Sequence, residues 1–265
     1  MTEHILIVNA GVLRPNGDGG RLNETMAALA REAFEEADLV VETTDLRGEW
    51  TLDDEVEKIA RARLLLVQTP IWAMSTPWQF TRWQDEVLTH PKVCGTDGRT
   101  RNDPSKKYGT GGFLTDRFYW LSTTWNAPLE AIEEPGQFFD GRGLEGVLMP
   151  LHKQFAYMGM RPFLPTFAVT DVYKNLTVDE DLERWRETLK RAAKRSPSSR
   201  ASKPAPQPAT AAMKQGPRSC LDRSPCFDGK RIFFSRYSAK KSLPASLAFS
   251  RSPARTIVRP SGSAK

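Results

Sequence analysis

The chain has 265 residues, of which 39% are hydrophobic and 26% are charged, and this is enough for one sizeable hydrophobic core. Its net charge of +6 is unevenly distributed. Residues 1–194 contain 23 Lys and Arg against 30 Asp and Glu, whereas residues 195–265 contain 15 against 2. Because the basic balance belongs to the carboxyl-terminal segment, nucleic-acid binding is excluded as the default interpretation of residues 1–194.

The sequence contains no apolar run near the roughly 18 residues that a membrane-spanning helix needs. Its first residues, Met-Thr-Glu-His, lack the basic and apolar regions of a secretory signal. The three cysteines, Cys94, Cys220 and Cys226, form no disulfide framework and no CxxC metal motif. We therefore expect a cytoplasmic protein without a structural metal, whose first 194 residues bind neither nucleic acid nor membranes.

The first part of the chain alternates predicted strands with predicted helices. His4–Asn9 is a short apolar run, typical of a buried strand, and a glycine-containing loop follows it. In residues 22–34, apolar side chains recur at spacings of three and four, which predicts a helix. The pattern then predicts a strand at residues 39–43, a helix at residues 52–62 and a continuous apolar strand at residues 64–68.

The same alternation continues to residue 194. The predicted elements are a helix at residues 77–88, a strand at 118–123, a mostly helical stretch at 144–158, a strand at 165–170 and a charged amphipathic helix at 179–194. Strands that alternate with helices form a parallel sheet covered on both faces. We therefore predict one α/β domain in residues 1–194, built on a doubly wound, five-stranded parallel sheet.

Residues 195–265 have a different composition, with 14 Ser and 9 Pro among them. Low hydrophobicity combined with high net charge cannot offset the entropy of ordering, so we predict that this tail is disordered. Its partner is unknown, and two interpretations of it stay open. The tail could bind nucleic acid, an anionic membrane or an acidic partner, or it could be a read-through or frameshifted sequence without a selected role.

Ligands of open parallel sheets bind beyond the carboxyl ends of the strands, so the loops that follow the strands are the candidate site. The first of these loops ends in Gly19 and Gly20, directly before a predicted helix. Glycine N–H groups and a helix N-terminus together favour a phosphate. The loop matches neither a GxGxxG dinucleotide fingerprint nor a P-loop, and by itself a plain turn with a helix cap accounts for it equally well.

Two further strand-end loops are aromatic. Residues 70–78 contain two Trp and two Pro, which would form a stiff wall for stacking a planar ring, although a Trp-rich contact surface is the simpler alternative. Residues 123–128, with Trp125 and Asn126, predict a second aromatic and polar wall. Together the three loops predict a site for a phosphorylated planar cofactor.

The usual catalytic motifs are missing from the sequence. No GxSxG motif is present, Cys94 has no basic residues that mark it as reactive, and His152 more often would cap or pack than catalyse. The long polar loop at residues 97–112 contains Lys106, Lys107 and Tyr108, which could meet phosphates and a ring or could simply face solvent. If the domain catalyses a reaction, the cofactor carries the difficult step.

Three motifs carry a resemblance to a known family. They are DGRTRNDPSKKYGTGG (residues 97–112), LSTTWNAPLEA (residues 121–131) and GVLMPLHKQFAYMGMRPFLPTF (residues 146–167). With them, residues 3–193 resemble the modulator of drug activity B family of NADPH-dependent quinone reductases, which are relatives of DT-diaphorase. The resemblance implies a flavodoxin-like fold, a homodimer, FAD bound at sites shared between subunits, and quinones reduced by two electrons from NADPH.

The resemblance also implies which residues contact the cofactor. The pyrophosphate and ribityl part of the flavin would meet Asp18, Gly19, Gly20, Arg21, Leu22, Asn23, Glu24 and Thr25. The isoalloxazine ring would lie against Pro70, Ile71, Trp72 and Ala73, and Tyr108, Thr124, Trp125, Asn126 and Ala127 would complete the contacts, some from the partner subunit. Relatives typically have a bulky aromatic residue where this chain has Ala73, so this departure bears on quinone preference.

The implied reaction is a ping-pong hydride transfer from NADPH through FAD to the quinone. No catalytic side chain is required, although Tyr108, Tyr157 or His152 could donate a proton to the quinone oxygen. The competing interpretation is a catalytically weak scaffold whose basic tail provides the binding function. Deletion of residues 195–265 distinguishes the two, because only the enzyme keeps its main activity without the tail.

Overall fold

A computed structural model describes residues 3–13, 19–174 and 177–195. Its centre is a parallel sheet with the order β2-β1-β3-β4-β5, and β6 also pairs with β4. The strands among the described residues are β1 (His4–Asn9), β2 (Val40–Asp45), β3 (Leu64–Pro70), β4 (Phe118–Thr124), β5 (Arg161–Pro162) and β6 (Phe167–Val169). This order confirms the predicted doubly wound sheet.

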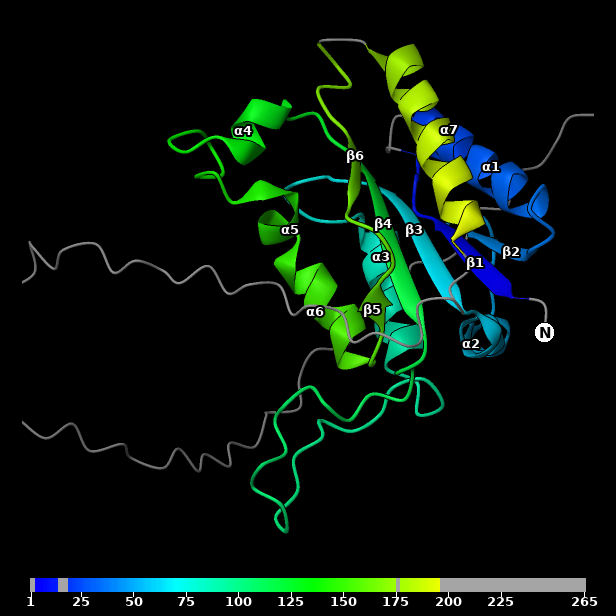
Figure 1. Ribbon diagram of the computed structural model, residues 1–265, viewed down its shortest axis with the longest axis vertical. Helices are drawn as coiled ribbons and strands as arrows, with labels where there is room; N and C mark the ends of the chain where they lie inside the picture. The colour runs from blue at the N-terminus through cyan, green and yellow to red at the C-terminus, as the bar shows by residue number, and fades with distance from the viewer. Residues whose placement is uncertain (1–2, 14–18, 175–176, 196–265) are drawn as a thin grey trace, which may run out of the picture. The chain divides into compact units, whose positions relative to one another are not determined.

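Helices cover both faces of the sheet, as predicted (Figure 1). Their bounds are α1 (Arg21–Glu35), α2 (Leu52–Arg61), α3 (Trp78–Trp83), the π-helical η1 (Gln84–Leu88), α4 (Leu129–Glu133), α5 (Gly143–Val147), α6 (Met149–Tyr157) and α7 (Val178–Lys194). The predicted helix at residues 77–88 therefore consists of α3 and η1. The stretch predicted as mostly helical contains α5 and α6, and the short helix α4 had no predicted counterpart.

Alternating side chains of the central strands divide the core into two layers. Ile5 and Ile7 of β1 pack with Met26 of α1 and Trp185 of α7, on the face that these two helices cover. Leu6 and Val8 belong to the other layer, which receives side chains from α2, α3 and α6. Because both layers are apolar, β3 is buried at every residue, as a central parallel strand should be.

The strand predicted at residues 165–170 corresponds to β6, whereas β5, which also pairs with β4, had no predicted counterpart, so the sheet has six described strands and not five. Pro165 lies in the gap and has no N–H to donate to a neighbouring strand. The next residue, Thr166, donates its backbone N–H to Oε1 of Glu145, at 2.8 Å, and not to β4. The edge of the sheet is therefore interrupted at Pro165, which leaves this segment bent away from β4 between its two short strands.

A buried carboxylate fixes α2 against the sheet. Glu55 is fully buried, and its oxygens accept hydrogen bonds from Thr44 of β2 and from the indole of Trp83, both at 2.8 Å. Lys58, one turn along the helix, lies 2.6 Å from the same carboxylate. A buried charge is tolerated when it is paired and hydrogen-bonded in this way.

The predicted disordered tail, apart from Arg195, lies outside the described residues, and the domain boundary at residue 194 stays a prediction. Among the helices that the structure describes, none has the length and the apolar character needed to cross a membrane.

Candidate functional site

The loops that leave β1, β3 and β4 are joined by buried hydrogen bonds at the carboxyl edge of the sheet. Asn23, in the first turn of α1, donates to Oγ1 of Thr124 at the end of β4, at 3.1 Å. Gln68 of β3 donates to Oδ1 of Asn23, at 2.9 Å. All three side chains are buried. This triad, Asn23–Gln68–Thr124, holds the start of α1 against the ends of the two central strands.

Glycine allows the first loop to approach the sheet closely. Gly20 adopts a left-handed φ of 81°, and a Cβ there would lie 2.4 Å from the carbonyl oxygen of Gly11. Gly11 in turn lies against Asn23, where a Cβ would come within 2.4 Å of the Asn23 Cβ. The positive φ and the close contacts show why only glycine fits at these turns. Asp18, the first residue of the predicted set, lies outside the described residues.

The amino terminus of α1 has no side-chain cap among the described residues, and the first N–H groups of a helix have no partner within the helix. Arg21 and Thr25 of the predicted set are exposed, and Leu22 is half-buried. A helix of 15 residues with an uncapped start favours an anion at this position.

An ion-paired cluster lies beside the same turn of α1. Arg47 contacts Oε2 of Glu24 at 2.8 Å and Oδ2 of Asp45 at 2.5 Å. Its hydrogen bond holds the pKa of the Glu24 carboxyl below the usual range. Burial alone would raise the pKa of Asp45, but hydrogen bonds from Arg47 outweigh it and lower that pKa as well. The negative charge of Glu24 is thereby offset next to the anion-favouring helix start.

The loop after β3 begins with a tight turn. Trp72 and Ser75 exchange backbone hydrogen bonds of 2.7 and 2.8 Å, while Ala73 and Met74 between them have positive φ angles of 44° and 65°. Two positive φ angles are the signature of a type I′ turn, which glycine and asparagine normally occupy. Pro70 is buried, Ile71 and Trp72 are half-buried, and Ala73 is exposed at the tip of the turn.

A cavity of about 230 Å³ adjoins this turn. The turn contributes Met74 and Ser75, η1 contributes Gln84, and α6 contributes Leu151 and Gln154. Gln84 donates a hydrogen bond to Gln154 across the cavity wall. The cavity is therefore bounded by the predicted ring-binding turn and by α3, η1, α5 and α6, which the sequence pattern had not connected with it.

The predicted exposed wall at Trp125 is wrong as far as its side chain is concerned. The indole is 2% exposed, and its N–H donates to Oγ1 of Thr123 at 2.8 Å. The backbone of Trp125 is hydrogen-bonded as well, to Val169 and Val172. Trp125 therefore supports the loop from inside the core, while Asn126 is exposed and Ala127 is half-buried beside it.

Tyr108 and Tyr157 lie together, with ring centroids 5.5 Å apart, but not at the carboxyl edge. Tyr157 ends α6, four residues before Arg161, which pairs with the first residue of β4. The loop that carries Tyr108 extends from this amino end of β4 (Figure 1). A strand of seven residues is about 23 Å long, so one chain does not bring Tyr108 to Thr124.

His152 is held in an internal network. Nδ1 of His152 lies 2.9 Å from the hydroxyl of Tyr119, and Nε2 lies 2.5 Å from Oε2 of Glu145. Partial burial would raise the pKa of Glu145, but the hydrogen bonds from His152 and Thr166 together outweigh it and lower that pKa. His152 does not line the cavity beside Trp72, so its position favours a role in packing.

Gln68 is a residue of the candidate site that sequence reasoning missed. With Thr69, it is one of two polar residues in an otherwise apolar, fully buried strand, and such an exception is the signal that could have identified it. Among the residues that the structure describes, no group of three or more His, Cys, Asp or Glu side chains could hold a metal ion.

Comparisons with known proteins agree with this arrangement. The family model described as a flavodoxin-like fold matches residues 3–192. The chain belongs to this flavodoxin-like family. An uncharacterized protein of Schizosaccharomyces pombe is 41% identical over 177 residues, which are 66% of this chain and 89% of the relative. NADPH:quinone oxidoreductase MdaB of Haemophilus influenzae is 36% identical over 174 residues, which are 65% of this chain and 90% of that protein.

Solved structures share the fold of this flavodoxin-like protein at low sequence identity. NAD(P)H:quinone oxidoreductase from Methanothermobacter marburgensis superposes with a TM-score of 0.51 at 16% identity, and the match covers 72% of this chain and 98% of the other. At this identity the likeness establishes the fold alone.

Proposed function

We propose that the chain is a flavin-dependent NAD(P)H:quinone oxidoreductase that transfers two electrons from NADPH through FAD to quinones by a ping-pong mechanism. The relation to an NADPH:quinone oxidoreductase at 36% identity supports the reaction class. The flavodoxin-like fold, which matches nearly all of the described domain, supports a flavin site at the carboxyl edge of the sheet.

The observation that carries the proposal is the Asn23–Gln68–Thr124 triad. Its hydrogen bonds bring the start of α1 and the ends of β3 and β4 to one place on the sheet. A ligand with a phosphate at one end and a planar ring at the other would then meet the start of α1 and the turn at Trp72 together. A flavin nucleotide has this form, and the arrangement fits it.

The residues of the chain would bind the cofactor mainly through their backbone. N–H groups of Gly20, Arg21 and Leu22 lie at the uncapped start of α1 and suit the phosphates. Ala73 and Met74 have no backbone hydrogen-bond partner among the described residues, so their N–H groups at the tip of the turn are available to the polar edge of the ring. A bound flavin supplies the hydride transfer itself.

The substrate side of the site is the cavity beside Trp72. Its lining combines the apolar side chains of Leu148 and Leu151 with the amides of Gln84 and Gln154. Such a lining holds an apolar ring and orients its oxygen atoms by hydrogen bonds. Tyr108 and Tyr157 are candidate proton donors, and desolvation together with the neighbouring Tyr108 raises the pKa of Tyr157, so its hydroxyl is protonated at neutral pH.

We further propose that the enzyme is a homodimer in which Tyr108 reaches the site of the other subunit. Tyr108 is 68% exposed and lies beside Tyr157 near the amino end of β4, whereas the other described residues of the predicted cofactor set lie around the carboxyl ends of the strands. A C2 dimer brings such distant surfaces together in pairs. Tyr108 would then complete a site that a single chain leaves without it.

Steady-state assays on the full chain and on residues 1–195 test the proposed reaction. Oxidation of NADPH and of NADH is followed with a panel of quinones, after reconstitution with FAD or with FMN. We expect quinone-dependent oxidation of NADPH, greater with FAD than with FMN, and equal rates for the two chain lengths. Absence of quinone reduction with either flavin, or activity that requires residues 196–265, would contradict the proposal.

A further inference from the structure

A second, larger cavity has a volume of about 530 Å³. It lies between the last turns of α7 and the segment that joins β5 to β6. Leu164, Pro165 and Phe167 form its apolar side. This segment lies between the two short stretches, β5 and β6, that pair with β4, and the cavity is located where that pairing is interrupted. None of the residues of the candidate flavin site lines it.

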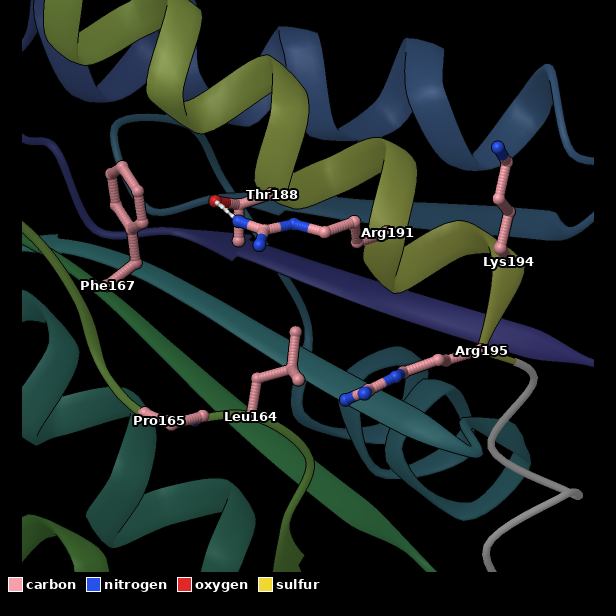
Figure 2. Close-up of a pocket in the computed structure, with 7 residues that line it drawn as sticks. All are labelled: Leu164, Pro165, Phe167, Thr188, Arg191, Lys194 and Arg195. Carbon is pink, nitrogen blue, oxygen red and sulfur yellow. Dashed lines mark hydrogen bonds between the residues drawn. The ribbon is translucent and has the colours of Figure 1, made fainter.

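Two arginines face the apolar side of this cavity. Figure 2 shows the Arg191 side chain reaching toward Thr188 and Phe167 and the Arg195 side chain directed toward Leu164; Lys194 also lines the cavity, although its amino group points away from these side chains. Nη2 of Arg191 donates to Oγ1 of Thr188 at 3.2 Å, which fixes its direction. The backbone N–H of Arg195 donates to the carbonyl of Ala192 at 3.0 Å, so this residue continues from the helix in a defined position.

No described residue neutralises the charges of these two arginines. Within the described residues neither guanidinium forms an ion pair, and no carboxylate lines the cavity. Arg184 on the same helix is a contrast. Its guanidinium is paired with Asp181 at 2.6 Å, donates to the carbonyl of Ala168 and stacks on Phe167 at 4.3 Å. Arg184 therefore has its partners within the fold, and Arg191 and Arg195 are left for another partner.

We propose that this cavity binds a small organic anion with an apolar body, such as a medium-chain carboxylate. The guanidinium groups of Arg191 and Arg195 would bind the carboxylate by charge-assisted hydrogen bonds, and Leu164, Pro165 and Phe167 would contact the apolar body. The volume lies within the range of cavities that hold small ligands.

Charge disfavours two alternatives to such a ligand. Residues 196–265 contain 14 Lys and Arg but only 2 Asp and Glu, so the tail of this chain is a poor occupant for a cationic cavity. Residues 1–194 carry more acidic than basic residues, so general adsorption of anions to the domain is also disfavoured. A ligand that is both anionic and apolar matches the local lining better than either.

Calorimetric titration of the full chain, with straight-chain carboxylates from butyrate to decanoate as probes, tests the proposal. We expect one saturable site for decanoate, with affinity rising about three- to fourfold for each added methylene until the apolar side is covered. Decyltrimethylammonium, which has the same chain and the opposite charge, should not bind there. The measurement needs neither flavin nor quinone, so it stands apart from the proposed enzymatic function.

Substitutions on α7 and at its end identify the site. The double variant R191Q/R195Q should raise the Kd for decanoate about tenfold or more, because both charged partners of the carboxylate are removed. The matched control K190Q removes one positive charge from an exposed residue of α7 that does not line the cavity, and it should leave the Kd unchanged. Circular dichroism checks that each variant is folded.

Three results would overturn the proposal. They are no saturable binding of decanoate, an equal Kd for R191Q/R195Q and the wild-type chain, and equal binding of decyltrimethylammonium. A Kd that does not change with chain length would show that the apolar side takes no part, and this too would contradict the assignment.

Discussion

Gly20 is the residue on which the close approach of the first loop depends. Its φ of 81° is strained for any L side chain, and a Cβ would also collide with the carbonyl oxygen of Gly11. Gly136 has a similar φ of 85°, but nothing lies within 4 Å of its Cβ position. Alanine at position 136 would therefore introduce backbone strain alone, whereas alanine at position 20 would introduce both strain and a steric collision.

We predict that Gly136→Ala lowers the free energy of unfolding by about 1–2 kcal/mol, which is the cost of the left-handed conformation alone. Gly20→Ala should cost more, because strain and collision add, and it should also weaken flavin retention. Denaturant unfolding measures the first effect and flavin content of the purified protein the second. Equal destabilisation by the two substitutions, with flavin retained in both, would show that the approach of Gly20 to Gly11 has no special role.

Single residues were also the least predictable part of the site. Glycines before a helix and aromatic residues after strands are visible in the sequence, and the structure does place Gly20, Asn23, Trp72 and Thr124 at one edge. The direction of a side chain is not visible in the same way. Trp125 follows its strand as the aromatic pattern suggested, yet its indole turns into the core, because Thr123 offers it a buried hydrogen-bond acceptor.

The turn at residues 72–75 is the element whose backbone departs most from its residue preferences. Ala73 and Met74 both have positive φ angles, which cost about 1–2 kcal/mol for each residue other than glycine. Glycine at position 73 would remove this cost and would lose about 0.5–1 kcal/mol through greater freedom of the unfolded chain. We predict that Ala73→Gly raises the free energy of unfolding by about 0.5–1 kcal/mol.

Thermal or denaturant unfolding measures this change. Ala27→Gly provides the matched control, because Ala27 lies inside α1, where glycine should destabilise the protein by about 1 kcal/mol. If Ala73→Gly destabilises the protein as much as Ala27→Gly does, residue 73 is not strained and the turn differs from the one described.

The contact between Glu145 of α5 and His152 of α6 should make the free energy of unfolding depend on pH. The pKa of Glu145 in the folded protein lies below its ordinary value of 4.5, because the hydrogen bonds from His152 and Thr166 together outweigh partial burial. A carboxyl group with a lowered pKa stabilises the fold above its unfolded pKa, and this contribution disappears as the pH falls through the folded pKa. The difference in unfolding free energy between the wild-type chain and Glu145→Gln should therefore shrink between about pH 6 and about pH 3.

Unfolding curves at several pH values test this dependence. Glu130→Gln is the control, since Glu130 is exposed on α4 and forms no ion pair among the described residues. A constant difference between the wild-type chain and Glu145→Gln over the whole range would mean that the contact with His152 does not stabilise the carboxylate.

At the level of elements, periodicity predicted the helices and strands that carry continuous apolar patterns, and these include every central strand. It did not predict where patterns are interrupted by contacts with other elements. The strand predicted from Pro165 pairs with β4 only from Phe167, because the N–H of Thr166 donates to a carboxylate on α5, and the short strand β5 before it was not predicted. That partner is 21 residues away in the sequence, so no local pattern could show it.

At the scale of the whole molecule, Tyr108 lies apart from the other described residues of the candidate flavin site. Its loop leaves the sheet at the amino end of β4, whereas the triad and the Trp72 turn lie at the carboxyl end. Sequence patterns reveal the composition of the loop but not its direction, so this separation within a single chain could not be predicted. A homodimer resolves the separation if each site combines the edge of one subunit with Tyr108 of the partner subunit.

Mixed dimers test this arrangement. Trp72→Ala removes part of the edge, and Tyr108→Ala removes the contribution from the loop, so each variant alone should have little quinone reductase activity. When the two variants are unfolded and refolded together, half of the dimers should contain both chains and each should hold one intact site. We predict recovery of about a quarter of wild-type activity. No recovery in confirmed mixed dimers would place Tyr108 in the site of its own chain or outside it.

The proposed function requires that the loops after β1, β3 and β4 together bind one flavin. Titration of the purified full-length chain with FAD, followed by the absorbance and fluorescence of the flavin, tests this claim most directly. We predict saturation at one FAD per chain with a perturbed flavin spectrum, and loss of this binding in Gly20→Ala but not in Gly136→Ala. A flavin that stays free in solution with the folded wild-type chain would contradict the claim.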